Sequence, residues 1–252
     1  MHRLYPGRTM LESISYAGSS GRLWLLMLLL FCVRVVLLLG NYWLSESYSG
    51  TEYVYELLWH IFLVWWYLVV ALCILHRVRG EHTGLFACMR SGLLRLCHAW
   101  WLVVWMTLLS WAHISLICRY YCVTEGVDLI LLLLVSILII VQLALNFFIV
   151  PEIADQRYDV LHLYVRAFDL LRSHFVRMVQ FFLLLFAFFF MAALVALCLV
   201  LFTRTLTECV VFCAWMPRVG ESIIVASATT LTETVLVVAQ VLFYLRRHER
   251  VV

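Results

Sequence analysis

Six long apolar segments dominate the sequence and leave few folds open to it. A helix rises about 1.5 Å per residue, so about 20 apolar residues cross the hydrocarbon layer of a membrane, which is roughly 30 Å thick. The six segments lie at residues 23–43, 54–75, 99–117, 129–150, 178–202 and 223–245. They predict an all-α protein, a polytopic membrane helix bundle of about six transmembrane helices in a single domain over residues 1–252.

The composition indicates that much of the surface faces lipid. Hydrophobic residues make up 65% of the chain and charged residues 13%, against about 45–50% and about 25% in soluble domains. A soluble fold of this size could not bury so much apolar surface. The 18 basic residues are all arginines, and apart from Arg34 they are scattered among the loops, which argues against a nucleic-acid-binding face.

The distribution of the arginines predicts the orientation in the membrane. Fourteen of them lie on one side of the six segments, and three, Arg119, Arg204 and Arg218, lie on the other. Because cytoplasmic loops carry an excess of arginine and lysine, both termini are predicted to be cytoplasmic. An even number of spans is consistent with two termini on one side.

A periodic polar pattern follows the fourth segment. Its polar members recur every three or four residues and are Asp159, His162, Arg166, Asp169 and Arg172. The opposite face is expected to hold Val160, Leu161, Tyr164, Val165, Phe168 and Leu171. This spacing predicts an amphipathic helix along the cytoplasmic interface of the membrane. Pro151 is expected to end the preceding span, because proline disfavours helical geometry in the residue before it.

The segment after the second span looks like a weaker copy of this one. A shift of 76 residues aligns Arg90 with Arg166, Leu94 with Leu170 and His98 with His174. An internal duplication would give two related halves and a second amphipathic helix. Chance alignment of apolar sequence explains the match equally well.

The stretch around these residues carries a short motif. It begins with Val150, Pro151, Ile153 and Asp155, and continues with Arg166, Ala167, Phe168 and Leu170. In this the chain resembles bacterial inner-membrane proteins of the YciC type and the membrane domain attached to some glycerophosphodiester phosphodiesterases. The resemblance covers residues 145–200, and it implies a six-span protein of the bacterial inner membrane. It supplies no catalytic residues, and the earlier segment departs from it with Leu75 where the repeat would place the proline.

Two charged residues lie near the middle of predicted spans, Arg34 in the first and Glu233 in the sixth. A charge at this depth costs about 2.5–3.5 kcal/mol on insertion scales. Since pairing would satisfy both charges, we predict that they face each other. Such a pair could be a structural clasp that closes the bundle, or it could be a proton or substrate site.

Other polar residues within the spans are expected to serve packing. Gln142 and Asn146 lie one turn apart and could hydrogen-bond a neighbouring helix. His60 and His113 have no second ligand three or four residues further along, so no metal site is predicted. Glu56 lies near the end of a span, where its side chain could reach the interface.

Four cysteines lie on the predicted outer side, namely Cys118, Cys122, Cys209 and Cys213. In an oxidising compartment, a disulfide could join these two outer loops. Reduced cysteines near the membrane interface are an equally good interpretation.

The sequence holds no motif of a known enzyme class. It lacks a phosphate-binding loop, a dinucleotide fingerprint, a zinc-protease motif and a nucleophile elbow. We therefore predict a protein without catalytic activity, metal or cofactor, concerned with the envelope or its lipids. Its expected partners are the lipid bilayer and other membrane proteins, or further copies of itself. A small transporter that uses Arg34 and Glu233, an accessory subunit of a membrane complex and a viral multispan protein are the alternatives.

Overall fold

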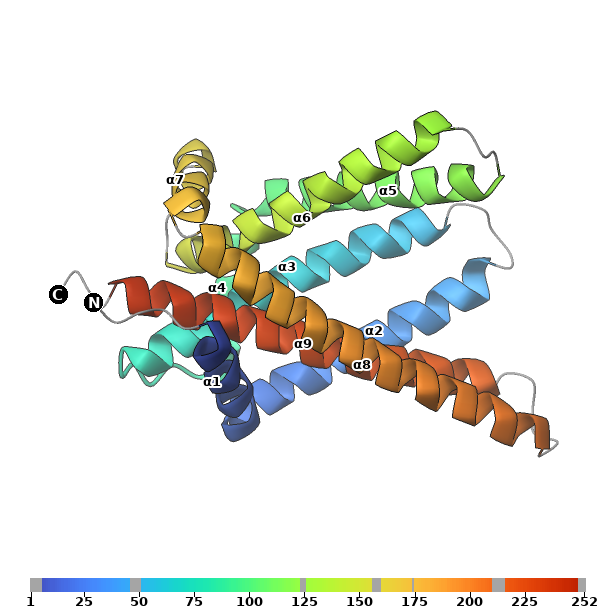
Figure 1. Cartoon of the computed structure of the whole chain (residues 1–252). Coiled ribbons are helices and arrows are strands. Elements are labelled where there is room, and N and C mark those ends of the chain that lie inside the picture. The colour runs from blue at the N-terminus through green and yellow to red at the C-terminus, as the bar shows by residue number, and fades with distance from the viewer. Residues whose placement is uncertain are drawn as a thin grey trace. The chain divides into compact units, whose positions relative to one another are not determined.

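The computed structural model describes residues 6–45, 51–122, 126–155, 160–173, 175–209 and 216–248 (Figure 1). Within these ranges the chain forms nine helices and no strand, which confirms the all-α prediction. The helices are α1 Pro6–Ser19, α2 Gly21–Ser45, α3 Thr51–Val78, α4 Leu85–Leu96, α5 Trp100–Cys122, α6 Gly126–Ala154, α7 Val160–Ser173, α8 Phe175–Cys209 and α9 Met216–His248.

Five of the described helices, α2, α3, α6, α8 and α9, are long and apolar enough to cross a membrane. A sixth crossing is obtained when α5 is taken together with α4, from which it bends by 72°. The prediction of about six transmembrane helices is therefore confirmed as five or six. Even α9, the most polar of the predicted spans, contains an apolar stretch over Val219–Leu245.

The order of the described helices repeats three times along the chain. A short helix of 14, 12 or 14 residues precedes two long helices in α1 to α3, α4 to α6 and α7 to α9. The sequence alignment related only α4 to α7. The structure adds α1 as a third member of this series in chain order.

The chain divides into two compact units. One is Met1–Ser49 with His174–Val252, which contains α1, α2, α8 and α9, and the other is Gly50–Ser173, which contains α3 to α7. We call them the discontinuous unit and the continuous unit. A single domain over residues 1–252 stays a prediction.

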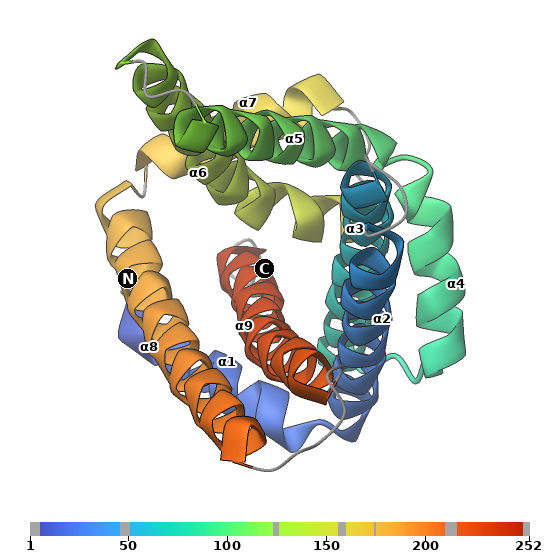
Figure 2. The same cartoon turned by 90° about the vertical axis from the view of Figure 1, so that its right-hand side faces the viewer.

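In the continuous unit, α3 packs against α4, α5 and α6. Its residues from Trp66 to Leu75 are all buried. Helix α4 lies beside α3 (Figure 2) at a very close approach, where a Cβ atom added to Gly92 would stand 2.6 Å from Val69 Cγ2. The Trp65 Nε1 group donates a hydrogen bond of 3.2 Å to the Met89 carbonyl at the same contact. A glycine and an indole therefore fix α4 on α3.

In the discontinuous unit, α9 packs against α1, α2 and α8. Its residues from Thr234 to Val241 are all buried. The threonines of α9 fit this apolar setting because their hydroxyls can bond to the preceding turn. Thr234 Oγ1, for example, donates to the Thr230 carbonyl at 2.8 Å.

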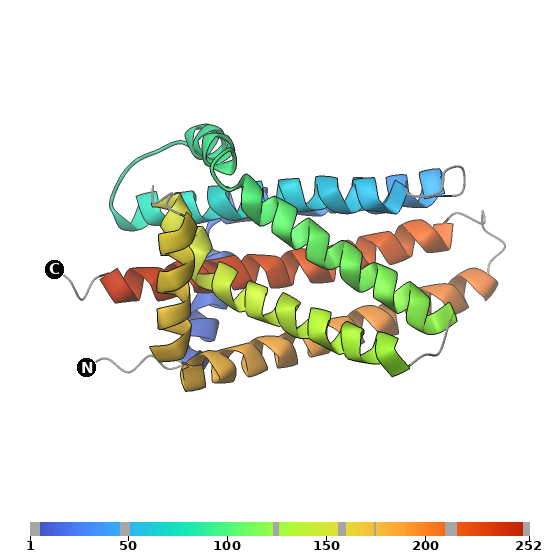
Figure 3. The same cartoon turned by 90° about the horizontal axis from the view of Figure 1, so that it is seen from above.

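The prediction that Pro151 ends the fourth span is wrong, because α6 continues to Ala154 with Pro151 inside it. Proline at this position removes one helix hydrogen bond, and its ring crowds the carbonyl of the residue four positions earlier. The turn is closed by the Asp155 N–H group, which donates to the Pro151 carbonyl at 3.0 Å. Helix α7 then runs across this end of α6 (Figure 3).

Candidate functional site

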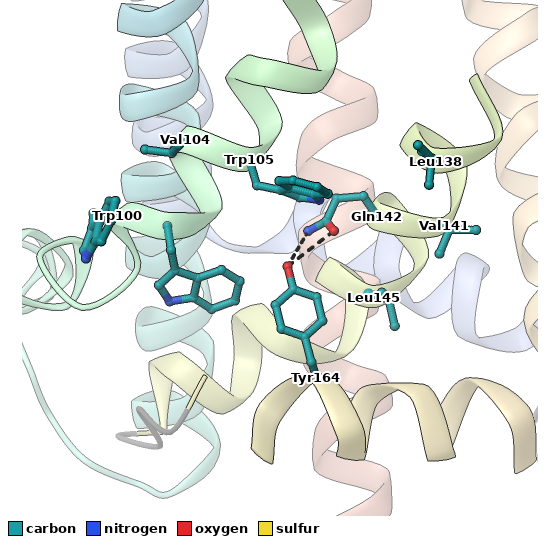
Figure 4. A pocket seen from close by; sticks show the side chains of 9 residues that line it. Trp100, Val104, Trp105, Leu138, Val141, Gln142, Leu145 and Tyr164 are labelled. Atoms are coloured by element: carbon teal, nitrogen blue, oxygen red, sulfur yellow. Dashed lines mark hydrogen bonds between the residues drawn. The ribbon is translucent and has the colours of Figure 1, made fainter. Parts of the chain in front are cut away.

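A pocket of about 540 Å³ lies between α5, α6 and α7 of the continuous unit (Figure 4). This volume falls within the range of about 300–1,000 Å³ that is usual for small-molecule sites. Helix α5 lines it with Trp100, Trp101, Val104 and Trp105, α6 with Leu138, Val141, Gln142 and Leu145, and α7 with Tyr164. The spacing of three or four residues places each set on one face of its helix.

The polar part of the pocket is formed by Gln142 and Tyr164, and Asn146 supports Gln142 from one turn further along α6. Gln142 Nε2 donates to Asn146 Oδ1 at 2.6 Å and to the Tyr164 hydroxyl oxygen at 3.2 Å. Gln142 and Asn146 are buried, and burial raises the pKa of the Tyr164 phenol above 10, against the smaller opposing effect of its hydrogen bond to Gln142. The phenol is therefore neutral at physiological pH and acts as a hydrogen-bonding group.

The aromatic wall of the pocket is open on one side. Trp100 is 61% exposed and Trp105 is 44% exposed, whereas Trp101 lies against the Tyr164 ring with centroids 5.1 Å apart. The lining residues include no carboxylate, histidine or thiol. Such a site can hold an elongated apolar molecule with one hydrogen-bonding group, and it is poorly equipped for acid–base catalysis.

The predicted polar residues that the structure describes on α7 have two different environments. His162, Asp169 and Arg172 are exposed, as expected. Arg166 instead points toward the end of α6, with Nε 3.5 Å from Glu152 Oε1. Asp159 lies outside the described residues.

The predicted apolar face of α7 differs from the side that packs inward, and its place at the membrane interface stays a prediction. The buried residues are Leu163, Ala167 and Leu170, whereas Val165 is 52% exposed and Phe168 is 58% exposed. A helix has 3.6 residues per turn, so residues 163, 167 and 170 form one stripe along α7. This stripe packs inward, and the bulky residues beside it face outward. Exposed apolar side chains on this helix fit a surface that meets lipid.

Two ion pairs hold this end of the continuous unit together. The buried carboxylate of Glu152 in α6 forms one with Arg166 of α7. Arg79, just after α3, forms the other by donating a hydrogen bond of 2.6 Å to Asp155 Oδ1. The sequence singled out Asp155 and Arg166 but not their partners. Arg79 and Asp155 are 76 residues apart, the same shift that aligns α4 with α7.

The other predicted site lies in the discontinuous unit. Arg34 of α2 and Glu233 of α9 are half-buried on helices that pack together, and their charges attract each other. The two residues thus lie close enough for the predicted electrostatic interaction. Their role as a clasp or as a site stays open.

Two contacts were not predicted from the sequence. Tyr164 of α7 was expected on an apolar face, yet its hydroxyl accepts a hydrogen bond from Gln142 of α6, which lies 22 residues earlier in the chain. His60 was treated as a packing residue, but Glu56 stands four residues before it. A search of both directions along the helix would have found the second relationship.

The predicted disulfide stays a prediction. Cys213 lies outside the described residues, and the structure does not describe the side chains of Cys118, Cys122 and Cys209.

Comparison with protein-family models gave no match, and comparisons with curated proteins and with solved structures gave no significant match.

Proposed function

We propose that this chain is a non-catalytic, multi-pass membrane protein that binds a membrane lipid in the pocket between α5, α6 and α7. The observation that carries this proposal is an open, tryptophan-lined pocket with a single hydrogen-bonding centre at Gln142 and Tyr164. An acyl chain would lie along the aromatic and aliphatic walls. The amide and the phenol would bind an ester or a hydroxyl of the lipid.

The surroundings of the pocket support a lipid over a water-soluble ligand. Its outer wall consists of Trp100, Val104 and Trp105, which are exposed although they are apolar. Tryptophan is enriched where a membrane meets water. The exposed Val165 and Phe168 of α7 lie on a helix that also exposes charged residues, as in helices that lie at a membrane surface.

The proposal includes a location. The excess of arginine on one side of the spans supports cytoplasmic termini. The resemblance over residues 145–200 supports a bacterial inner membrane. A role in the envelope that depends on binding lipid is consistent with both.

The test is photocrosslinking in vesicles that contain a phospholipid with a diazirine in its acyl chain. We expect crosslinks on peptides of α5 and α6 around the pocket, and at least a several-fold lower yield there in Trp105→Ala. Trp43→Ala is the control, because this exposed tryptophan of α2 is not among the residues that line the pocket. Equal labelling along all apolar helices, unchanged by Trp105→Ala, would refute a specific lipid site.

A small transporter is the second candidate, and the attraction between Arg34 and Glu233 favours it. Charged residues within spans often mark the path of an ion or a proton. Proton and solute flux into proteoliposomes should then fall severalfold in Glu233→Gln. If neither protein shows flux and the variant is only less stable, the pair is a structural clasp.

A further inference from the structure

A second polar cluster lies in the continuous unit, between α3 and α5. Ser110 Oγ donates to Glu56 Oε2 at 3.2 Å, and Thr107 Oγ1 lies 3.2 Å from His60 Nδ1. The other imidazole nitrogen, His60 Nε2, is 3.9 Å from Glu56 Oε2. One carboxylate and one imidazole thus face each other, each held by a hydroxyl from α5.

The cluster lies near one end of the α3 span, with a buried histidine and a half-buried carboxylate. The span of α3 begins at Tyr53, and His60 is only 8% exposed while Thr107 is 2% exposed. The hydroxyls restrict how the two titratable side chains can turn. Thr107 can bond to one ring nitrogen of His60, which leaves Nε2 directed toward Glu56.

The helices packed against α3 bring few other charges to this level. On α5, His113 is half-buried one turn beyond Ser110, and its Nδ1 atom has no hydrogen-bond partner among the described residues. Helix α6 has no titratable side chain between Ile130 and Val150. Helix α4 carries Arg90 and Arg95, but it meets α3 further along, at Trp65 and Val69.

The charge balance of the cluster depends on one proton. Without it, neutral His60 faces an ionised Glu56, and the cluster holds a net negative charge in half-buried surroundings. With it, the cluster is neutral, either as an imidazolium beside a carboxylate or as an imidazole beside a carboxylic acid. The proton can pass between Nε2 and Oε2 after a small closure of their 3.9 Å separation, and no other group needs to change its charge.

We propose that Glu56 and His60, positioned by Ser110 and Thr107, form a proton-binding site within the membrane span. This site is separate from the lipid pocket and from the Arg34–Glu233 pair. It differs from a packing role for His60, which would require only the hydrogen bond to Thr107.

The experiment is a pH titration of the full-length protein in lipid bilayers, labelled with ¹⁵N in the histidine rings and followed by NMR. His60→Gln identifies the signals of His60. In the wild type we expect those signals to report the uptake of one proton as the pH is lowered from about 9 to about 5. In Glu56→Gln the proton affinity of His60 should fall by about tenfold or more, because the carboxylate that compensates its charge is gone.

Two further variants make the outcome decisive. Glu81→Gln is the matched control, because Glu81 pairs with His76 at an exposed position and should leave the signals of His60 unchanged. Ser110→Ala removes only the donor to the Glu56 carboxylate, so the site should hold its proton to higher pH. This variant keeps the test valid if Glu56→Gln does not fold. A His60 ring that stays neutral throughout, or a titration unchanged in both Glu56→Gln and Ser110→Ala, would overturn the proposal.

Discussion

Gly92 shows how one residue without a side chain can set the position of a helix. The backbone of α4 approaches α3 so closely that a methyl group at this position would overlap Val69. Valine is stiff about its first side-chain torsion, so it cannot easily turn aside. The contact also brings the Met89 carbonyl within reach of the Trp65 indole.

We expect Gly92→Ala to destabilise the protein by about 1–2 kcal/mol. Overpacking costs about 1–3 kcal/mol, and the better helix propensity of alanine offsets up to about 1 kcal/mol of that. Gly18→Ala is the control, because no atom lies within 4 Å of a Cβ added there, and it should be neutral or slightly stabilising. Unfolding in mixed micelles, followed by circular dichroism, measures both. Equal stability of the two variants would contradict the close approach.

Single residues also show where sequence reasoning reaches its limit. Gln142 and Asn146 were predicted to be neighbours because a helix places residues four apart on one face. Their partner Tyr164 could not be predicted, because it depends on how α7 turns back across α6. The ion pair between Arg79 and Asp155 is likewise a product of tertiary packing, and no local pattern marks it.

At the scale of elements, the contact between α6 and α7 depends on a neutral phenol. Burial raises the pKa of Tyr164 in the folded protein, so folding favours its protonated form. The stability that this contact contributes is therefore fully present below pH 10. It is lost as the pH rises from about 10 through the higher pKa of the folded state.

Tyr164→Phe should remove this alkaline dependence. At neutral pH the variant should lose about 1 kcal/mol, because Gln142 keeps its bond to Asn146 but loses the phenol. Unfolding free energies of both proteins at pH 8, 10 and 11 provide the test. If the difference between them does not shrink above about pH 10, the phenol does not contribute in its neutral form.

Element boundaries were predicted well where the apolar runs alone determine them. Each of the six predicted segments falls within one long helix, except that the third was predicted to begin at residue 99, one residue before α5. The bend of 72° between α4 and α5 was not predicted, because it depends on tertiary packing, which also brings Gly92 of α4 against α3. The end of α6 was predicted too early, since the contacts of Glu152 and Asp155 keep its last turn helical beyond Pro151.

At the scale of the whole molecule, hydropathy identifies a membrane protein but says little about its sites. The pocket between α5, α6 and α7, the α3–α5 cluster and the Arg34–Glu233 pair are each made from residues on different helices. Only the last was predicted, because two charges in apolar spans stand out without any knowledge of packing. The other two sites are built from hydroxyl, amide and indole groups, which are common in membrane spans. They indicate a site only once the fold brings groups from different helices together.

The division into two units has a consequence for the order in which the protein can be made. All of the continuous unit lies between Gly50 and Ser173, so its helices can assemble while the ribosome is still working. The discontinuous unit needs α8 and α9 before α1 and α2 have their partners. Helix α2, which is long and apolar enough to cross a membrane, must therefore stay without α9 until late in synthesis, and a chain that stops before α9 would leave it exposed to membrane quality control.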